Sequence, residues 1–454
     1  MTDKRSFTIL GAGRSGIAAA GLLKKNGYEV FLSEENQEDS LKYFNKEFLL
    51  KEKIEFETGG HSERIYDNDV FIVSPGIPPE SEVILKAVRL GKKILSEIEV
   101  ASEFCKCPII AITGTNGKTT TAVLTGEIFR NAGYDVKVCG NVGLAFSEIV
   151  SDLKENSIVI LEVSSFQLEY TENFRPDVSV ILNITPDHID WHKSFENYLY
   201  AKEKIRRNQT VENLSVLNFD DKILRDELQN SNAAEAFFSI KNDIQESEIK
   251  RGCMIKNNRV IYFDKSKNIN EIIMETHEIN IRGNHNLYNS LAALISARAF
   301  DIKKEIIKDT LIRFKGVEHR IEFVRELDGV KYYNDSKATN IDSVIVALES
   351  FEKDLILILG GKESGNDYSV IDKLVSERVK IIVAIGESKN NIIEHFSKIV
   401  KCESTESLDE AVKYCKVNSS KGDSVLLSPA CKSFDMFDSY EHRGKEFKKA
   451  VNNL

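Results

Sequence analysis

A short segment directly after Ile112, TGTNGKTT, contains the residue types needed to bind a polyphosphate. Gly114 and Gly117 allow the backbone to approach an anion closely. Lys118 can reach the outer phosphates, and the Thr119 hydroxyl can ligate magnesium. Because Ile112 stands where a full Walker A sequence has its first glycine, the segment predicts a shortened phosphate loop. The alternative is an ordinary turn between a strand and a helix.

Two further segments offer metal ligands directly after apolar runs. Glu162 follows SIVIL, so it should lie at the carboxyl edge of a parallel sheet, where open α/β folds bind their ligands. The segment NITPDHIDWH places Asp187, His188, Asp190 and His192 after VSVIL. Carboxylate oxygens suit magnesium or manganese, whereas histidine suits zinc more readily. Spacing alone favours a metal site and a plain polar turn about equally.

Near the N-terminus, Gly11, Gly13 and Gly16 form a GxGxxG pattern between an apolar strand and a helix. Glu34 and Glu35 close the next strand, and this combination taken alone indicates dinucleotide binding. A nicotinamide dehydrogenase would also need a site for hydride transfer. The only phosphate loop with a lysine and a hydroxyl lies further along the chain, so the pattern by itself does not indicate a dehydrogenase.

Alternating apolar runs and helical patterns place these segments in three regions. FTIL, GAGRSG and IAAAGLLKKNG form the strand, turn and helix of a first βαβ unit, and CPIIAITGTNGKTT begins a new one. KDLILILGG, VKIIVAIG and DSVLLSPA repeat the alternation in the last third. We therefore predict an α/β protein of three domains. They are a Rossmann-like domain over 1–102, a central P-loop ATPase-like domain over 103–302 and a C-terminal Rossmann-like domain over 303–454.

Composition excludes several classes of protein. The chain of 454 residues is 42% hydrophobic and 29% charged, as expected of a folded globular protein. Its net charge of -10 disfavours an extended contact with nucleic acid or anionic lipid. There is no signal-peptide pattern and no apolar run of the roughly 18 residues that would span a bilayer, so we expect a cytoplasmic protein. Cys105 and Cys107 lack the second pair of a zinc site, which favours reduced thiols for all seven cysteines.

The shortened phosphate loop resembles that of the Mur ligases and of the related folylpolyglutamate synthetases. Similar segments follow in the family order from about residue 5 to about residue 447. The most specific segment is NDSKATN, which follows GVEHRIEFV and resembles the D-glutamate-adding branch. The resemblance implies an ATP-dependent ligase of peptidoglycan precursor synthesis. Such a ligase adds D-glutamate to UDP-N-acetylmuramoyl-L-alanine through an acyl phosphate, with two Mg²⁺ sites.

The resemblance also implies roles for individual residues in nucleotide and metal binding. In the family the Glu and the first His of the two metal segments bind the second magnesium, which implies Glu162 and His188. In the family, the lysine of an Ala-Lys pair is carbamylated and becomes a metal ligand. The resemblance implies this role for Lys202, with Lys204 as the other candidate. A lysine on a helix is otherwise solvated. Lys118, Glu162, His188 and Lys202 are thus the expected catalytic residues, and Thr119 joins the last three as the expected metal ligands. The expected ATP contacts are Gly114, Thr115, Asn116, Gly117, Lys118, Thr119, Thr120, Asn286, Asn289, Arg320 and Asp335.

Two substrate sites are implied as well, and a site divided between domains implies closure before chemistry. A family basic residue lies four positions after the glycine that corresponds to Gly360, but Ser364 stands there, and Lys362 is the nearest lysine. Asn286 and Asn289 could instead cap helices or turns, and the proline turn after Ser74 could be purely structural. The expected UDP-substrate contacts are Gly13, Arg14, Ser15, Gly16, Ser33, Ser74 and Asn141, and the expected D-glutamate contacts are Lys337, Thr339, Lys362, Ser433, Phe434 and Tyr440.

Two alternatives remain at this point. Another amino-acid-adding Mur ligase or a folate polyglutamylating enzyme would share the middle domain but should lack NDSKATN. A protein of another class could sense UDP sugars and hydrolyse ATP without ligation. We expect a monomer whose partners are the two small-molecule substrates, with no nucleic acid and no membrane insertion.

Overall fold

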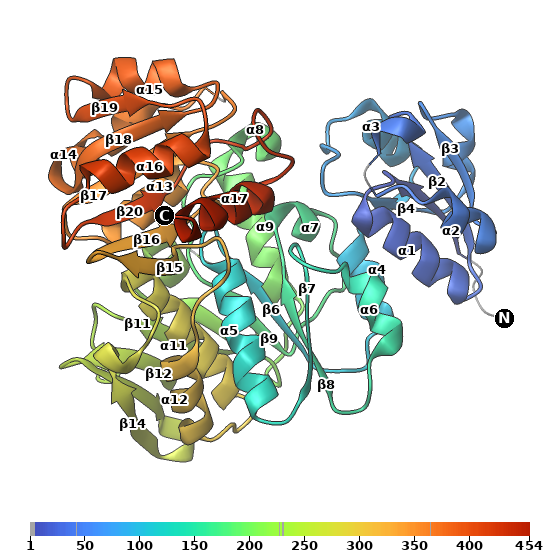
Figure 1. Ribbon diagram of the computed structural model, residues 1–454. Coiled ribbons are helices and arrows are strands. Elements are labelled where there is room, and N and C mark those ends of the chain that lie inside the picture. The colour runs from blue at the N-terminus through green and yellow to red at the C-terminus, as the bar shows by residue number, and fades with distance from the viewer. Residues whose placement is uncertain (1–4, 42, 227, 229–230, 364) are drawn as a thin grey trace. The chain divides into compact units, whose positions relative to one another are not determined.

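The computed structural model describes residues 5–41, 43–226, 228, 231–363 and 365–454. It has three separate sheets with helices between the strands, which confirms the α/β class (Figure 1). The chain forms two compact units, Met1–Ile279 with Tyr288–Ile312 and Asn280–Leu287 with Arg313–Leu454. The first two sheets belong to the first unit and the third sheet to the second. The predicted domain limits at 102 and 302 remain predictions.

The first sheet has five parallel strands in the order β3-β2-β1-β4-β5. Its central strands are largely buried because helices cover both faces, with α1, α2 and α4 on one face and α3 on the other. The elements are β1 (Ser6–Leu10), α1 (Arg14–Lys25), β2 (Glu29–Glu34), η1 (Glu38–Ser40), α2 (Lys46–Lys51), β3 (Glu55–Thr58), η2 (Glu63–Asp67), β4 (Val70–Val73), α3 (Glu82–Arg89), β5 (Lys93–Ser96) and α4 (Glu97–Phe104).

The second sheet has nine strands in the order β14-β13-β12-β11-β10-β9-β6-β8-β7. The strands from β7 to β12 are parallel, and β13 is antiparallel to both of its neighbours, β12 and β14. The strands are β6 (Ile109–Thr113), β7 (Asp135–Gly140), β8 (Ser157–Glu162), β9 (Val178–Ile181), β10 (Leu214–Asn218), β11 (Ala234–Ser239), β12 (Arg251–Lys256), β13 (Arg259–Asp264) and β14 (Ile269–Glu275). The helices are α5 (Lys118–Asn131), α6 (Phe146–Ile149), η3 (Val150–Asp152), α7 (Ser165–Glu169), α8 (Ile189–His192), α9 (Phe195–Arg207), α10 (Lys222–Asp226), η4 (Lys265–Lys267), η5 (Thr276–Glu278), α11 (Asn284–Arg298) and α12 (Lys304–Arg313).

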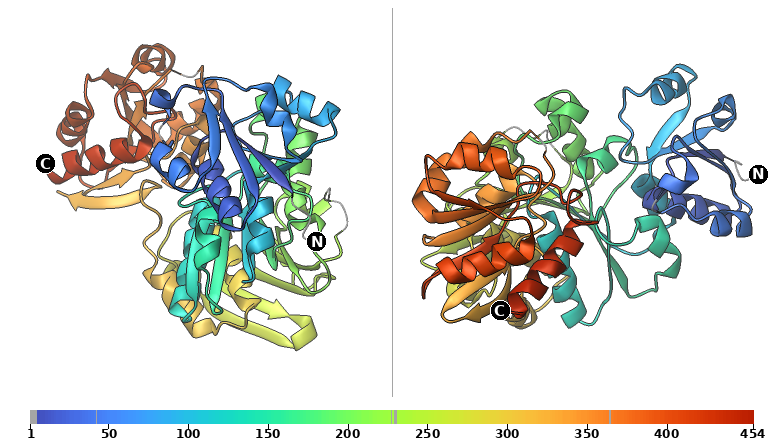
Figure 2. Two further views of the ribbon diagram at one scale, coloured as in Figure 1. Left: turned by 90° about the vertical axis from the view of Figure 1, so that its right-hand side faces the viewer. Right: turned by 45° about the horizontal axis from the view of Figure 1, so that its top comes forward.

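The third sheet has six strands in the order β15-β16-β20-β17-β18-β19, parallel except for the pair β15 and β16. Helices α13, α14 and α15 pack on one face, and α16 and α17 on the other (Figures 1 and 2). The elements are β15 (Glu322–Leu327), β16 (Val330–Asn334), α13 (Ile341–Glu349), β17 (Leu355–Gly360), η6 (Tyr368–Ile371), α14 (Asp372–Arg378), β18 (Val379–Ile385), α15 (Lys389–Phe396), β19 (Lys401–Ser404), α16 (Leu408–Asn418), β20 (Ser424–Leu427) and α17 (Tyr440–Asn452).

The backbone conformation and close packing of the turn between β1 and α1 require glycine at two positions. Gly11 has a φ of 95°, and a Cβ atom at Gly16 would collide with the Gly11 carbonyl oxygen. The helix therefore lies closer to the turn than any residue with a side chain would allow. This close packing directs the N-terminus of α1 at the space beyond the carboxyl ends of β1 and β4.

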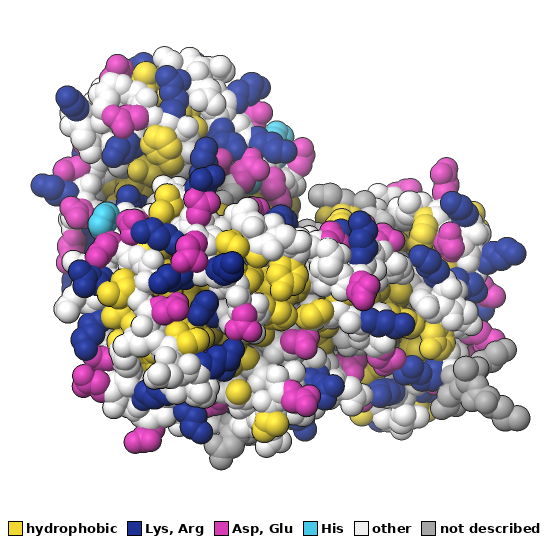
Figure 3. Space-filling view, turned by 90° about the horizontal axis from the view of Figure 1, so that it is seen from below, with side chains coloured by type: hydrophobic (Ala, Val, Ile, Leu, Met, Phe, Trp, Pro, Cys, Tyr) yellow, Lys and Arg dark blue, Asp and Glu magenta, His cyan; other side chains and the backbone are white. Residues whose placement is uncertain are grey.

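Surface and thiol chemistry agree with the expectations from composition. Within the described residues, no helix is long and apolar enough to cross a membrane. All seven cysteines are free, and Cys139, Cys253, Cys415 and Cys431 are buried. On the face drawn in Figure 3, basic and acidic side chains alternate over short distances. That face therefore offers no large area of one charge sign.

Candidate active site

The predicted phosphate loop lies between β6 and α5. Gly114 has a φ of 148° and Gly117 a φ of 88°, so both positions need glycine. A Cβ atom at Gly117 would also collide with Oδ1 of Asn289 from α11, which accepts a hydrogen bond from the Thr121 hydroxyl at 3.1 Å. Helix α5 begins at Lys118, and no side chain caps its N-terminus. The first turn of this helix can therefore direct its positive end at an anion.

Two lysine side chains meet on this loop. Lys118 Nζ donates to the carbonyl oxygens of Gly114 at 2.9 Å and Thr115 at 2.8 Å. Lys202 reaches the same Gly114 oxygen from α9, at 3.0 Å. Only 2% of Lys202 is exposed, and this burial, helped by the charge of Lys118, lowers the pKa of Lys202 well below its ordinary value. The Lys202 side chain is therefore an amine held inside the site and not a solvated surface charge.

Glu162 lies at the end of β8, beside β6 in the sheet, where Ile112 is its partner in the register. The side chain is buried, and one carboxylate oxygen accepts a hydrogen bond at 2.9 Å from Nδ2 of Asn141, which follows β7. The described part of the chain provides no hydrogen bond to the other oxygen. That oxygen is available to a cation, as the prediction for Glu162 requires.

His188 begins α8 in a left-handed conformation, with a φ of 54°, and its ring lies 4.7 Å from that of Phe166. Burial lowers its pKa, and the charges of Lys118 and Lys202 act in the same direction against the opposing effect of Asp187. A neutral imidazole is the form that ligates a metal. Glu162, His188 and the Thr119 hydroxyl supply mainly oxygen donors near the phosphate loop, and this set fits a hard cation such as Mg²⁺.

The other residues predicted to contact the nucleotide are divided between the two units, some in the first and some in the second. Thr115 and Asn116 are held against β9 and the loop that follows it, by hydrogen bonds from Thr115 N to the Asn183 carbonyl and from Asn116 N to Asn183 Oδ1. Thr120 is buried in the first turn of α5. Asn286, Arg320 and Asp335 belong to the second unit, where Asn286 Nδ2 donates to the Arg282 carbonyl.

In the second unit, the NDSKATN segment follows β16 and is fixed by buried polar groups. Asp335 accepts hydrogen bonds from the backbone N–H of Ile321 at 3.2 Å and from the Ser428 hydroxyl at 2.8 Å. Burial raises the pKa of Asp335 to about 7, although the nearby charge of Arg320 opposes this shift. Arg443 is buried and donates to the hydroxyl and the carbonyl oxygen of Ser336.

We expect the free energy of unfolding to depend on the protonation of Asp335. The unfolded chain releases this proton near the ordinary pKa of 3.8, whereas the folded chain holds it to about pH 7. Stability from this group therefore falls as the pH rises from about 4 to about 7 and then stays constant. Between about pH 5 and about pH 7, urea unfolding followed by circular dichroism should lose about 2 kcal/mol more in the wild type than in Asp335→Asn. An equal pH dependence in the two proteins would contradict this assignment.

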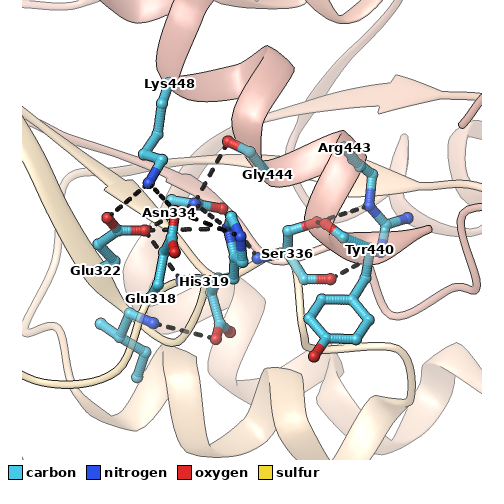
Figure 4. Close-up of polar contacts among 11 residues, drawn as sticks. Glu318, His319, Glu322, Asn334, Ser336, Tyr440, Arg443, Gly444 and Lys448 are labelled. Atoms are coloured by element: carbon cyan, nitrogen blue, oxygen red, sulfur yellow. Dashed lines mark hydrogen bonds and ion pairs between the residues drawn. The ribbon is translucent and has the colours of Figure 1, made fainter. Parts of the chain in front are cut away.

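A second buried group of the same unit was not predicted (Figure 4). His319 has a φ of 64° and its Nδ1 accepts a hydrogen bond from Asn334 Nδ2 at 2.8 Å. Glu318, His319 and Glu322 are close enough together to bind a metal, but Lys448 forms ion pairs with both carboxylates. The ammonium group supplies the positive charge, so we interpret the cluster as structural. The sequence held one signal for it, the histidine directly before Arg320.

The predicted D-glutamate residues differ in exposure. Lys337 is anchored through its backbone N–H to the His319 carbonyl, and its Nζ lies 5.9 Å from the centre of the Tyr440 ring. Lys362 is exposed and forms a backbone hydrogen bond to Lys432. Ser433 is buried, Thr339 is half-buried and 64% of Phe434 is exposed. Position 364, where the sequence departs from the family, lies outside the described residues.

A cavity of about 640 Å³ lies beyond the carboxyl ends of the strands of the first sheet, and Gly13 and Ser74 are among the residues that line it. Arg14 and Ser33 are not among the residues that line this cavity. The Arg14 guanidinium donates to the carbonyls of Gly143 and Asn141. Ser33 is completely buried and lies behind the cavity wall. Of the other predicted contacts, Ser15 is half-buried in the first turn of α1, Gly16 is packed against the glycine-rich turn, and Asn141 is bonded to Glu162.

Glu34 also differs from the acidic residue of a dinucleotide site. One of its oxygens accepts the Ala12 backbone N–H at 2.7 Å, and the other accepts the backbone and side-chain N–H groups of Asn36. Burial alone would raise the pKa of this carboxyl group, but these hydrogen bonds hold it below its ordinary value. The carboxylate is thus used to close the glycine-rich turn and is not free to bind a ribose, which argues against a dinucleotide in the usual arrangement.

A phosphate loop with two lysines, beside a carboxylate and a neutral histidine, defines a nucleotide-dependent enzyme of the α/β class. Family models match residues 6–83 (MurD N-terminal domain), 112–297 (Mur ligase middle domain) and 319–431 (Mur ligase, glutamate ligase domain). Curated relatives called UDP-N-acetylmuramoylalanine–D-glutamate ligase are 42% identical in Salinibacter ruber and 43% identical in Caldicellulosiruptor saccharolyticus. These alignments cover 98% and 99% of this chain and 97% and 99% of the relatives.

Solved structures share the fold. A pseudomurein peptide ligase type C from Methanothermus fervidus has a TM-score of 0.59 at 19% identity, with 99% of each chain covered. A MurF ligase from Thermotoga maritima in complex with ADP has a TM-score of 0.58 at 17% identity, with 100% of each chain covered. The chain belongs to the Mur ligase family and, within it, to the group of the UDP-N-acetylmuramoylalanine–D-glutamate ligases. The resemblance drawn from the sequence is thus confirmed.

Proposed function

We propose that this protein is an ATP-dependent ligase that joins D-glutamate to UDP-N-acetylmuramoyl-L-alanine during peptidoglycan precursor synthesis. Curated relatives named for this activity are 40–43% identical over 98–99% of the chain. The structural observation that carries the proposal is the meeting of Lys118 and Lys202 on the Gly114 carbonyl, next to the buried carboxylate Glu162. A site for a transferable phosphoryl group needs a lysine charge beside the phosphates and a carboxylate that can hold a cation, and Lys118 and Glu162 supply these two groups.

The reaction we propose proceeds through an acyl phosphate. A carboxylate is a poor acyl donor, so the alanine carboxylate first attacks the γ-phosphorus of ATP, and ADP leaves. Lys118 and the N-terminus of α5 bind and orient the phosphates and stabilise the charge that gathers on them. Two Mg²⁺ ions, held by Thr119 and by Glu162 with His188, would supply further charge neutralisation. The amine of D-glutamate then attacks the acyl carbon and displaces phosphate.

Asn141 and Glu162 fix the geometry of the metal side of the site. The Asn141 amide donates to one Glu162 oxygen, and the Glu162 carbonyl accepts the Asn141 backbone N–H at 2.9 Å. These two hydrogen bonds, both donated by Asn141, hold the carboxylate in one orientation before any ligand binds. Preorganised groups of this kind lower the reorganisation needed in the transition state.

An assay of phosphate release with a panel of amino acids tests the proposed function. We expect turnover only when ATP, the UDP-linked precursor and D-glutamate are all present. Turnover with another amino acid in place of D-glutamate would assign the chain to another ligation step. ATP hydrolysis that needs the UDP precursor but no amino acid would instead favour the UDP-sugar sensor. Omission of Mg²⁺ should abolish turnover.

Four finer points belong to the same proposal. We propose two magnesium sites, a monomeric enzyme, recognition of D-glutamate through Lys337, Thr339 and the segment after Cys431, and a reaction in the cytoplasm, where ATP is supplied. The two magnesium sites can be counted by titration with Mn²⁺ followed by electron paramagnetic resonance. Light scattering of the purified chain measures the oligomeric state.

A further inference from the structure

Behind the wall of the cavity in the first sheet lies a chain of three polar side chains. The buried Ser33 hydroxyl donates to Oε1 of Glu57 at 2.7 Å, and it lies 2.7 Å from Nδ1 of His61. His61 is half-buried and lines the cavity, whereas Ser33 and Glu57 do not. Of these three hydrogen-bonded side chains, the histidine is therefore the only one that a ligand in the cavity would contact.

This hydrogen-bond chain decides which histidine nitrogen carries a proton. A serine hydroxyl has one hydrogen, and Ser33 gives it to the Glu57 carboxylate, so its oxygen must accept from His61. The Nδ1 atom of His61 thus carries the hydrogen, and in the neutral ring Nε2 is left with a lone pair. Because Nδ1 is bonded to the buried serine, Nε2 is the ring nitrogen left for a ligand in the cavity. His61 therefore offers a hydrogen-bond acceptor at a fixed position.

The charges around the cavity indicate which part of a nucleotide enters it. Glu34, Glu35, Glu63 and Glu82 line the cavity, and its single lysine, Lys86, is already paired with Glu63. Such a surface repels phosphate but suits the N–H and O–H donors of a nucleoside. The positive N-terminus of α1 begins directly after Gly13, which also lines the cavity. The diphosphate should accordingly lie at the helix and the base within the cavity.

We infer that His61 selects uracil, because its Nε2 accepts the hydrogen bond of the uracil N3–H group. The inference rests on the proposed function, which supplies a UDP-linked substrate. Cytosine is nearly isosteric with uracil but has a lone pair at N3, which would face the lone pair of the histidine. Ser33 acts as a positioning residue, since it fixes the tautomer without contact to the ligand, and this replaces the direct contact between Ser33 and uridine expected from the sequence.

Calorimetric titration of the full chain with UDP and with CDP tests the inference. We expect the wild type to bind UDP about tenfold more tightly than CDP, the size of effect that one neutral hydrogen bond and one repelled lone pair produce. His61→Ala should reduce this ratio to below about twofold, mainly through weaker UDP binding. Ser33→Ala, which frees the ring to change tautomer, should give an intermediate ratio. Tyr66→Phe is the matched control in the same cavity, and it should keep the wild-type ratio.

The outcomes separate this inference from the proposed function. If His61→Ala or Ser33→Ala kept the full preference for UDP, the role of His61 would be overturned while the ligase assignment stood. If the wild type bound neither UDP nor CDP and did not turn over the UDP-linked precursor, the proposed function itself would fail. Thermal unfolding of each variant shows whether it is folded, and Ser33→Ala keeps the test decisive if His61→Ala does not fold.

Discussion

Replacing Lys118 by alanine should lower the rate of ligation about a thousandfold or more, since the ammonium group stabilises charge that develops only as the phosphoryl group is transferred. In the structure its Nζ donates to the carbonyls of Gly114 and Thr115, so it is already held at the phosphate loop. The measurement is initial velocity of phosphate release with all three substrates saturating. Product formation by chromatography should fall in parallel.

Folding must survive for this result to be interpretable. Lys118 is the first residue of α5, and alanine is favourable in a helix, so the circular dichroism and melting temperature should remain close to those of the wild type. Lys118→Arg is a useful companion because it keeps the charge but changes its shape. Product formed by Lys118→Ala at the parental rate would refute the assignment of the loop to ATP.

Replacing Lys202 by alanine should lower the rate of ligation at least about a hundredfold. Burial and the neighbouring Lys118 favour the neutral amine at this position, and a neutral amine can attack carbon dioxide. The new N–C bond gives a carbamate, and one proton is released to solvent. The carbamate would add an anionic oxygen ligand to the Glu162 and His188 site. Enzyme prepared under labelled ¹³CO₂ should show a carbamate carbon resonance that Lys202→Ala lacks.

The matched control is Lys204→Ala, two residues further along α9. Lys204 is paired with Glu169 at 3.3 Å and does not touch the phosphate loop. Its loss should change the rate less than about threefold, as expected for an ion pair at the edge of the site. A larger loss of rate in Lys204→Ala than in Lys202→Ala would show that the modified lysine had been assigned to the wrong residue.

Much of the nucleotide site follows from sequence because it depends on local order along the chain. Lys118, Glu162 and His188 each come shortly after an apolar strand, and β8 and β9 lie on either side of β6 in the parallel sheet. The carboxyl ends of neighbouring parallel strands share one edge, so the sheet brings the three side chains to the same place. The fold class could be predicted for the same reason, since strands and helices alternate throughout.

Local sequence patterns do not predict the role of a side chain where burial and long-range pairing decide that role. Ser33 has the residue type and position of a ligand contact, but its hydroxyl is directed at Glu57 across the β2–β3 pair. His61 lies in a loop with no recognisable pattern, and only the tertiary structure places it in the cavity wall. Arg443, over a hundred residues from Ser336, fixes the NDSKATN segment through contacts that no local pattern predicts.

The one tryptophan of the chain lies beside the nucleotide site. The centre of the Phe166 ring lies 4.7 Å from the centre of the Trp191 ring and 4.7 Å from the centre of the His188 ring. Light absorbed selectively by indole is consequently emitted from this one neighbourhood. Stopped-flow measurement of tryptophan fluorescence in the unlabelled enzyme will report events around His188. Unfolding of the second unit will leave the tryptophan fluorescence unchanged unless it disturbs the surroundings of Trp191.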